Sequence, residues 1–200
     1  WKNTSSGEMF CCTDATAGEN VWTNVGAGSG DVKVTYGGSN YGFTASGHTW
    51  NASPSNVIDK FPFASDSNAT DHGDVTVAYG TSRGGSTNSQ THGYLCGGST
   101  GATVVNRIEK YQFSTSSNSV DAADLLGIKN NCAGTNSSSY GYVGGSYTSQ
   151  VIEKHPFASD SNSTSVGNMT TVHYGGASAS SGYHGYEMGG PTTSEAAYNG

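Results

Sequence analysis

The chain has 200 residues, of which only 12% are charged, and its formal net charge is −7. Eight Lys and Arg residues are too few for the basic face that nucleic-acid binding requires, and no apolar run approaches the roughly 20 residues of a membrane-spanning helix. The 3 Trp, 12 Tyr and 6 Phe residues also argue against disorder, because disordered chains are poor in aromatic residues. Composition therefore predicts a folded domain that neither binds nucleic acid nor inserts into a membrane.

Residues 1–30 predict an N-terminal β-hairpin. Two short apolar stretches, at 8–12 and 20–23, flank a Gly-containing turn. Cys11 and Cys12 are adjacent, so their side chains point to opposite faces of a strand and pair poorly. The other two cysteines are Cys96 and Cys132, for which a disulfide bridge is an alternative. We predict that all four are reduced apolar filling residues, and the absence of a C-x-x-C pair argues against a zinc site.

Residues 31–200 contain an internal repeat. A segment reading IDKFPF begins at Ile58 and returns as IEKYQF at Ile108 and IEKHPF at Ile152, so the copies lie 50 and 44 residues apart. An aromatic-Gly-aromatic triplet also recurs, and in its last three copies a Gly-Gly pair follows. The stretch 120–128 could be read as a helix, but it carries the Asp-Leu pair of the repeat and is predicted as strand or turn.

A period of about 44–51 residues with three or four short strands is typical of a β-propeller blade. The predicted fold class is therefore all-β, with propeller blades that follow the N-terminal hairpin. Three full repeats and a half repeat at each end account for residues 31–200. The ring either closes within this chain or includes further repeats, and a sequence that stops in mid-repeat favours the second alternative.

The repeat resembles a kelch-like family found in structural and tail-fibre-like proteins of tailed bacteriophages, especially those of marine bacteria. The stretches that carry the resemblance are 1–22, 58–68, 92–98 and 152–162. The chain departs from true kelch repeats because no spaced Tyr and Trp follow the Gly-Gly pair, and the middle copy has Gln112 for Pro and Ser116 for Asp. The resemblance implies a virion-surface protein that contacts other virion proteins, forms a homo-oligomer, and has no catalytic residues and no cofactor.

Three kinds of polar residue are candidates for chemistry. The repeated acidic-Lys pair, as in Glu109-Lys110, predicts links between blades rather than acid–base catalysis, which needs one tuned pair. The Asp/Asn-rich stretches at 66–71 and 160–164 are read as Asx-turns, with calcium binding as the alternative. The six His residues do not cluster, so we predict no metal site.

The aromatic-Gly-aromatic triplets are the predicted ligand-binding positions. Flat aromatic faces can stack on sugar rings, although their recurrence in every repeat also fits core packing. The candidate residues are Tyr41, His92, Tyr94, Tyr140, Tyr142, His184 and Tyr186. The stretches 81–90 and 176–183 differ between copies and are predicted as variable binding loops.

The leading hypothesis is a non-enzymatic phage structural protein, part of a fibre, a tail or a capsid decoration, that contacts a host surface glycan or receptor. Repeated weak contacts on a particle would gain strength by avidity. A secreted or cell-surface adhesive protein of a microbe is the alternative. A carbohydrate-active enzyme is a third hypothesis, against which stands the lack of a unique cluster of titratable residues.

Overall fold

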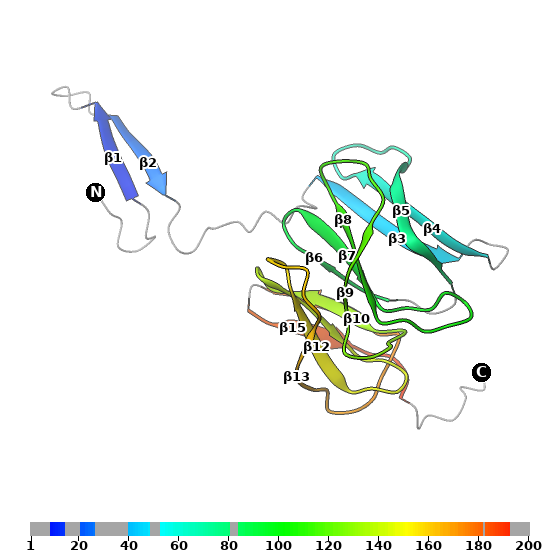
Figure 1. Cartoon of the computed structure of the whole chain (residues 1–200). Coiled ribbons are helices and arrows are strands. Elements are labelled where there is room, and N and C mark those ends of the chain that lie inside the picture. The colour runs from blue at the N-terminus through cyan, green and yellow to red at the C-terminus, as the bar shows by residue number, and fades with distance from the viewer. Residues whose placement is uncertain are drawn as a thin grey trace. The chain divides into compact units, whose positions relative to one another are not determined.

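The computed structural model describes residues 9–14, 21–26, 40–48, 53–80, 84–181 and 183–192. The chain divides into two units, residues 1–34 and residues 35–200. All regular structure in the described residues is β-strand, and every pairing between these strands is antiparallel, which confirms the all-β prediction (Figure 1). The described part has no helix that could cross a membrane.

The first unit contains one pair of strands, β1 (Met9–Asp14) and β2 (Val21–Gly26). They are antiparallel, with Cys11 opposite Thr23 and Cys12 opposite Trp22. The strands fall on the two apolar stretches from which the hairpin was predicted. The connection between them lies outside the described residues.

The described residues of the second unit form four sheets, which we number in chain order. Sheets 2 and 3 have four strands each, in the same consecutive order, while sheet 1 has three strands and sheet 4 has two. Sheet 1 is β3 (Tyr41–His48), β4 (Pro54–Pro62) and β5 (Thr70–Tyr79); sheet 2 is β6 (Gly85–Asn88), β7 (His92–Cys96), β8 (Arg107–Gln112) and β9 (Val120–Asp124); sheet 3 is β10 (Ala133–Asn136), β11 (Tyr140–Gly144), β12 (Val151–Pro156) and β13 (Thr164–Asn168); sheet 4 is β14 (Ala177–Ser180) and β15 (Gly185–Met188).

The sequence repeat falls on equivalent strands of these sheets. The IEK-type segments form β4, β8 and β12, and each pairs with the strand that holds the aromatic-Gly-aromatic triplet. The register is the same in each case, with Phe43 opposite Lys60, Tyr94 opposite Lys110 and Tyr142 opposite Lys154. The stretch 120–128 begins as β9 and turns after Asp124, as predicted.

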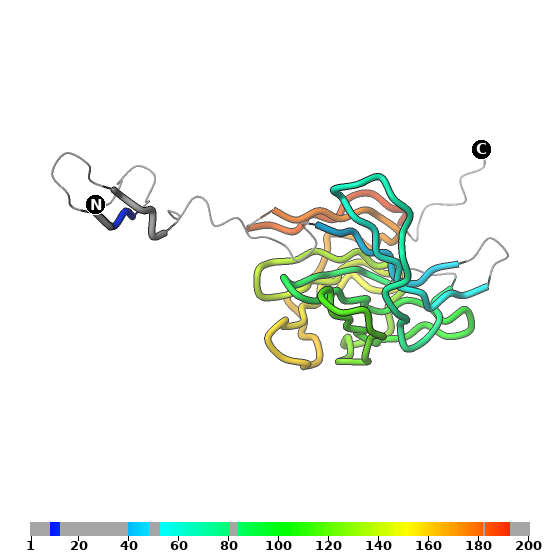
Figure 2. Tube along the Cα trace, turned by 90° about the horizontal axis from the view of Figure 1, so that it is seen from above, coloured from blue at the N-terminus to red at the C-terminus, as the bar shows by residue number. Residues whose placement is uncertain are grey.

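The two stretches predicted as variable loops instead contain strands, which is a correction. β6 lies within 81–90 and β14 within 176–183, and residues 81–83 and 182 lie outside the described part. These strands consist of Gly, Ser, Thr, Ala and Asn, so they lack the apolar alternation on which the prediction depended. Their small side chains allow sheets to approach closely, because a Cβ added to Gly134 in β10 would lie under 3.0 Å from the backbone of Ser86 in β6. In Figure 2, β14 and β15 (orange to red) run beside the yellow-green strands of sheet 3.

The Gly-Gly pairs end the second strand of sheets 2 to 4. Gly97 and Gly98 have φ angles of 70° and 109°, and Gly189 and Gly190 have φ angles of 69° and 93°. Such angles are sterically costly for residues with a Cβ, which explains the glycines at these four positions and at Gly145 in sheet 3, whose φ is 68°. Sheet 1 has Ser46 at the equivalent place with a φ of 65°, and its hydroxyl donates a hydrogen bond of 3.0 Å to the carbonyl oxygen of Ser55.

Two apolar clusters fill the spaces between sheets. Ile58, Val75, Tyr79, Leu95 and Tyr111 pack between sheets 1 and 2. The second cluster, between sheets 2 and 3, consists of Tyr94, Cys96, Ile108, Leu125, Cys132 and Val143. Cys96 and Cys132 lie in this core as thiols without a disulfide, while Cys11 is exposed and Cys12 is half-buried. Burial raises the pKa of the Cys132 thiol to about 11, so this thiol packs as an apolar group.

Candidate functional site

The acidic residue of the second repeated segment is buried between sheets 1 and 2. Glu109 in β8 accepts hydrogen bonds from the Thr76 amide at 3.2 Å and from the Ser119 hydroxyl at 2.5 Å. The Thr76 hydroxyl donates a further hydrogen bond to the same carboxylate. This side chain therefore joins the last strand of sheet 1 to sheet 2.

Glu153 in β12 repeats the contact one sheet later. It accepts a hydrogen bond of 2.7 Å from the Leu126 amide and another from the Ser163 hydroxyl. Its Oε1 also lies 3.4 Å from Nζ of Lys129, whose side chain is only 1% exposed. The predicted structural role of the carboxylates fits these contacts. Both carboxylates accept hydrogen bonds from a backbone amide and from hydroxyl groups, and Glu153 also forms an ion pair with Lys129.

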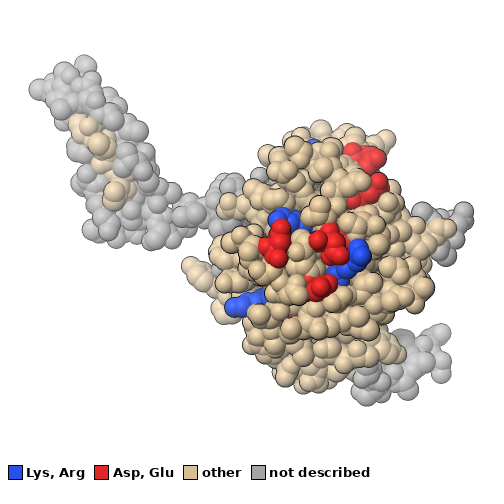
Figure 3. All heavy atoms as spheres, in the orientation of Figure 1, with Lys and Arg blue, Asp and Glu red and all other residues tan. Residues whose placement is uncertain are grey.

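The lysines of the repeated segments have different partners. Lys110 Nζ lies 2.7 Å from the Asp160 carboxylate of sheet 3, which is a second link between neighbouring sheets. Lys60 and Lys154 instead lie over the rings of Tyr41 and Tyr140, at 4.4 and 4.5 Å from the ring centroids. On the face seen in Figure 3, charged side chains gather near the middle, acidic beside basic, and most of the remaining described surface is uncharged.

The Asn-rich stretches also connect sheets. Asn118 Oδ1 accepts a hydrogen bond of 3.0 Å from the Asp74 amide, and Asn162 Oδ1 accepts one of the same length from the Asp124 amide. A backbone hydrogen bond accompanies each, at 2.8 Å. In the described residues, no group of three or more His, Cys, Asp or Glu side chains is arranged to hold a metal ion. The oxygen atoms of these Asn side chains are therefore used in structural contacts.

The seven predicted ligand-binding residues form two rows across the sheets. We call the first residues of the triplets, Tyr41, His92, Tyr140 and His184, the outer row. Tyr41 begins β3, the first described strand of sheet 1, while His92 and Tyr140 begin the second strands of sheets 2 and 3, and β15 begins directly after His184. Tyr41 is 40% exposed, His184 is exposed, and the other two are half-buried. These four rings remain open to solvent at one end of the sheets.

The third residues of the triplets, Phe43, Tyr94, Tyr142 and Tyr186, form the inner row. Phe43 is half-buried and stacks on Phe113 of sheet 2, at 4.7 Å between ring centroids. Tyr94 is covered by sheet 3, where it stacks on Phe157 at 5.2 Å between ring centroids, and is only 4% exposed. Tyr142 is half-buried, and Tyr186 of the last sheet is 50% exposed. The inner row is therefore a packing position, and Tyr94 is inaccessible to a ligand.

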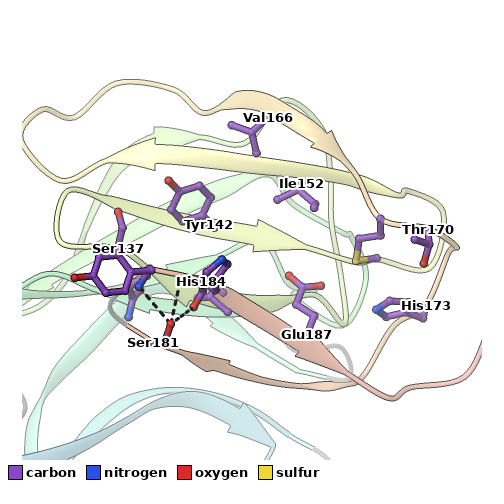
Figure 4. Close-up of a pocket in the computed structure, with 14 residues that line it drawn as sticks. Ser137, Tyr142, Ile152, Val166, Thr170, His173, Ser181, His184 and Glu187 are labelled. Carbon is purple, nitrogen blue, oxygen red and sulfur yellow. Dashed lines mark hydrogen bonds between the residues drawn. The ribbon is translucent and has the colours of Figure 1, made fainter.

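An open cavity of about 550 Å³ lies between sheet 3 and sheet 4 (Figure 4). Sheet 3 contributes Tyr142 and Ile152, and Met169 follows it directly. Sheet 4 contributes Glu187, with His184 beside it at the start of β15. Two of the seven predicted residues, Tyr142 and His184, thus meet at one cavity, while the others do not line it.

Two polar atoms beside this cavity are buried without a hydrogen-bond partner: Nε2 of His173 and Oε2 of Glu187. Burial raises the pKa of the Glu187 carboxyl, an effect that Lys129 and the Gly144 amide partly offset. Sequence reasoning missed both residues. The sequence did contain a signal for Glu187. This acidic residue occupies the repeat position that is held by the apolar Leu95 and Val143 in sheets 2 and 3.

His155 is a buried titratable group of the filled space between sheets 2 and 3. It is 2% exposed, its Nε2 lies 2.9 Å from the Thr87 hydroxyl, and burial lowers its pKa to about 4. The unfolded chain binds this proton near pH 6.5, so the unfolded state binds more protons between pH 6.5 and 4. The contribution of His155 to the free energy of unfolding is therefore fully present above pH 6.5, and it is lost as the pH falls towards 4.

Lowering the pH from 7.5 to 5.0 is expected to reduce the free energy of unfolding by about 2 kcal/mol through His155 alone. Urea unfolding of the native protein and of His155→Phe at both pH values measures this difference. The Phe variant mimics Phe61, the equivalent residue of sheet 1, and removes the titration. Effects of Glu187 are common to both proteins and cancel. If the free energy of unfolding depended equally on pH in the two proteins, His155 would not be the group whose titration changes the stability.

Comparison with known proteins gives no further guide to the site. A scan against protein-family models found no match, and a search of curated proteins found none either.

Proposed function

We propose that this chain is a non-enzymatic structural protein of a tailed-phage particle, built from kelch-like β-propeller blades, whose outer row contacts host surface glycans. In this proposal sheets 1 to 4 are successive blades, and the first strands β6, β10 and β14 are their inner strands. Contacts between β6 and β10 and between β10 and β14 support this arrangement. The proposal also draws on the resemblance of the repeat, which implies a place on the virion surface among other virion proteins.

The observation that carries glycan contact is the outer row. It places aromatic rings at the same end of successive sheets, with a Lys ammonium over the rings of Tyr41 and Tyr140. Aromatic faces bind the apolar faces of sugars, and neighbouring ammonium groups donate hydrogen bonds to sugar hydroxyls. The carboxylates of Glu109 and Glu153 are engaged in links between sheets, which favours binding over hydrolysis at these two residues.

Binding of the purified protein to an array of bacterial surface glycans tests this function. Tyr41→Ala and Tyr140→Ala are each expected to weaken binding about tenfold, the effect of losing roughly 1.4 kcal/mol of aromatic contact. Tyr147→Ala is the matched control, because Tyr147 is 50% exposed, against 40% for Tyr41, and lies outside the outer row.

Circular dichroism verifies that each variant is folded. Equal losses in Tyr147→Ala and the outer-row variants, or no binding by the folded protein, would contradict the proposal. Progressive hydrolysis of an arrayed glycan would favour the carbohydrate-active enzyme instead. The adhesive protein of a microbe predicts the same binding, and detection of the chain in purified phage particles decides between these two.

A further inference from the structure

The lysine of the repeated segment has a different charge environment in sheet 1 than in sheet 2. Lys60 and Lys110 each lie opposite an inner-row residue, and residues opposite each other share one face of a sheet. The inner-row rings face the next sheet, so both lysines face it as well. Lys110 Nζ accordingly lies 2.7 Å from the Asp160 carboxylate of sheet 3, whereas Lys60 forms no ion pair with a carboxylate of the described residues.

The loops that face these two lysines lie on the preceding sheet in the same way. In sheet 2 this loop is residues 113–119, and in sheet 3 it is residues 157–163. Asn118 and Asn162, at equivalent places in the two loops, each accept a hydrogen bond of 3.0 Å from a backbone amide of the preceding sheet. A backbone hydrogen bond of 2.8 Å follows each contact. The loop of sheet 2 therefore faces sheet 1 as the loop of sheet 3 faces sheet 2.

A serine replaces the acidic partner at the place that faces Lys60. The residue six positions after the repeated lysine is Asp66 in sheet 1, Ser116 in sheet 2 and Asp160 in sheet 3. Because Asp160 reaches back to Lys110 of the preceding sheet, Ser116 is the residue that occupies the equivalent place beside sheet 1. Ser116 is exposed and carries no charge, so the Lys60 ammonium lacks the counter-ion that its equivalent has.

On its face of sheet 1, Lys60 has an aromatic ring and an uncharged residue beside it. Its Nζ lies 4.4 Å from the ring centroid of Tyr41, which is 40% exposed. Thr70 lies opposite Lys60 on β5. Asp59 and Asp71 are also opposite each other, but one position along, so their side chains lie on the other face of the sheet. An exposed aromatic ring beside an ammonium without a counter-ion suits a ligand that has both an apolar face and a negative charge.

We propose that Tyr41 and Lys60 together bind an acidic sugar residue, which packs against the ring of Tyr41 and pairs its carboxylate or sulfate with the Lys60 ammonium. Acidic sugar binding rests on the proposed glycan contact of the outer row and specifies the class of glycan. Sheet 2 does not offer the same anion site, because Lys110 is already paired with Asp160. Lys154 of sheet 3 has no such comparison, since sheet 4 has only two described strands.

Binding of the full-length protein to acidic glycans and to their neutral forms tests this site. The probes are the acidic members of the bacterial glycan array, each paired with its carboxyl-reduced form or, for sulfated glycans, its desulfated form. The native protein should bind an acidic glycan about tenfold more tightly than its neutral form, through one charge-assisted contact. Which of the two treatments weakens binding distinguishes a carboxylate from a sulfate.

Variants at the repeat positions assign the preference to Lys60. Lys60→Gln, which removes the charge, should bind the acidic and neutral forms equally, with its affinity for the neutral form unchanged. Ser116→Asp supplies the counter-ion that Lys110 has, and it should likewise abolish the preference. Lys110→Gln is the matched control, because it removes a lysine of the same repeat position that is already paired, and it should retain the preference. Circular dichroism verifies that each variant is folded.

A preference for the acidic form that survives in folded Lys60→Gln, or that Lys110→Gln loses as well, would overturn the inference. Equal binding of the two forms by the native protein, or binding of neutral glycans alone, would also overturn it, while glycan contact by the outer row would stand. Absence of binding to every glycan would contradict the proposed function and the acidic sugar site together.

Discussion

Glu153→Ala is expected to lower the free energy of unfolding by about 3–5 kcal/mol, which is among the largest effects of any single substitution in this chain. The change removes the carboxylate partner of Lys129, whose side chain is 1% exposed, and leaves the buried ammonium with only the Val151 carbonyl and the Ser149 hydroxyl as hydrogen-bond acceptors. It also removes the acceptor of the Leu126 amide and the Ser163 hydroxyl. Urea unfolding followed by circular dichroism measures the loss.

A double variant separates the charge from the hydrogen bonds. Adding Lys129→Met to Glu153→Ala should restore part of the lost stability, because it removes the unpaired ammonium. Asp160→Ala is the matched control, since it breaks an ion pair whose Asp is half exposed and should cost under about 1 kcal/mol. If Glu153→Ala were no worse than Asp160→Ala, the carboxylate would not link sheets 2 and 3.

Gly134→Ala is expected to destabilise the protein by about 3 kcal/mol or more, by forcing two sheets apart. The added Cβ would lie under 3.0 Å from three backbone atoms of Ser86, which cannot rotate away as a side chain could. Because β10 and β6 approach through their backbones, relief requires movement of whole strands. Thermal unfolding monitored by circular dichroism measures the effect.

Gly127→Ala controls for the loss of backbone freedom in the unfolded chain. No atom lies within 4 Å of a Cβ at this position, and its φ does not lie in the left-handed region. The same substitution should therefore leave stability unchanged or raise it by a few tenths of a kcal/mol. Similar melting temperatures for the two variants would mean that β6 and β10 are not in backbone contact.

The sequence predicted the strands that carry apolar residues and missed those that do not. The IEK-type segments and the aromatic triplets were recognised because their side chains alternate and recur. The sequence predicts loops at β6 and β14, since strands of Gly, Ser, Thr, Ala and Asn have no apolar face by which to recognise them. These strands allow neighbouring sheets to approach closely. That role can be recognised only in the folded structure, where the neighbouring strand is present.

The candidate site was predictable in part. Outer-row and inner-row residues look alike in the sequence, and only coverage by the next sheet separates the solvent-facing Tyr41 from the buried Tyr94. The cavity between sheets 3 and 4 could not be predicted from the sequence. It forms because the aromatic residues that fill the other two spaces between sheets have no counterpart there among the described residues. The available signal in the sequence was Glu187, an acidic residue at a repeat position that is apolar in sheets 2 and 3.

The most direct test of the central claim, glycan contact through the outer row, is to locate a bound glycan on the folded protein by NMR chemical-shift changes. The glycan would be the tightest binder from the array, titrated into isotope-labelled protein. The proposal predicts that the changes concentrate at the four outer-row residues, with little change at Met169 and Glu187 in the cavity. Changes confined to the cavity, or spread evenly over the surface, would contradict it.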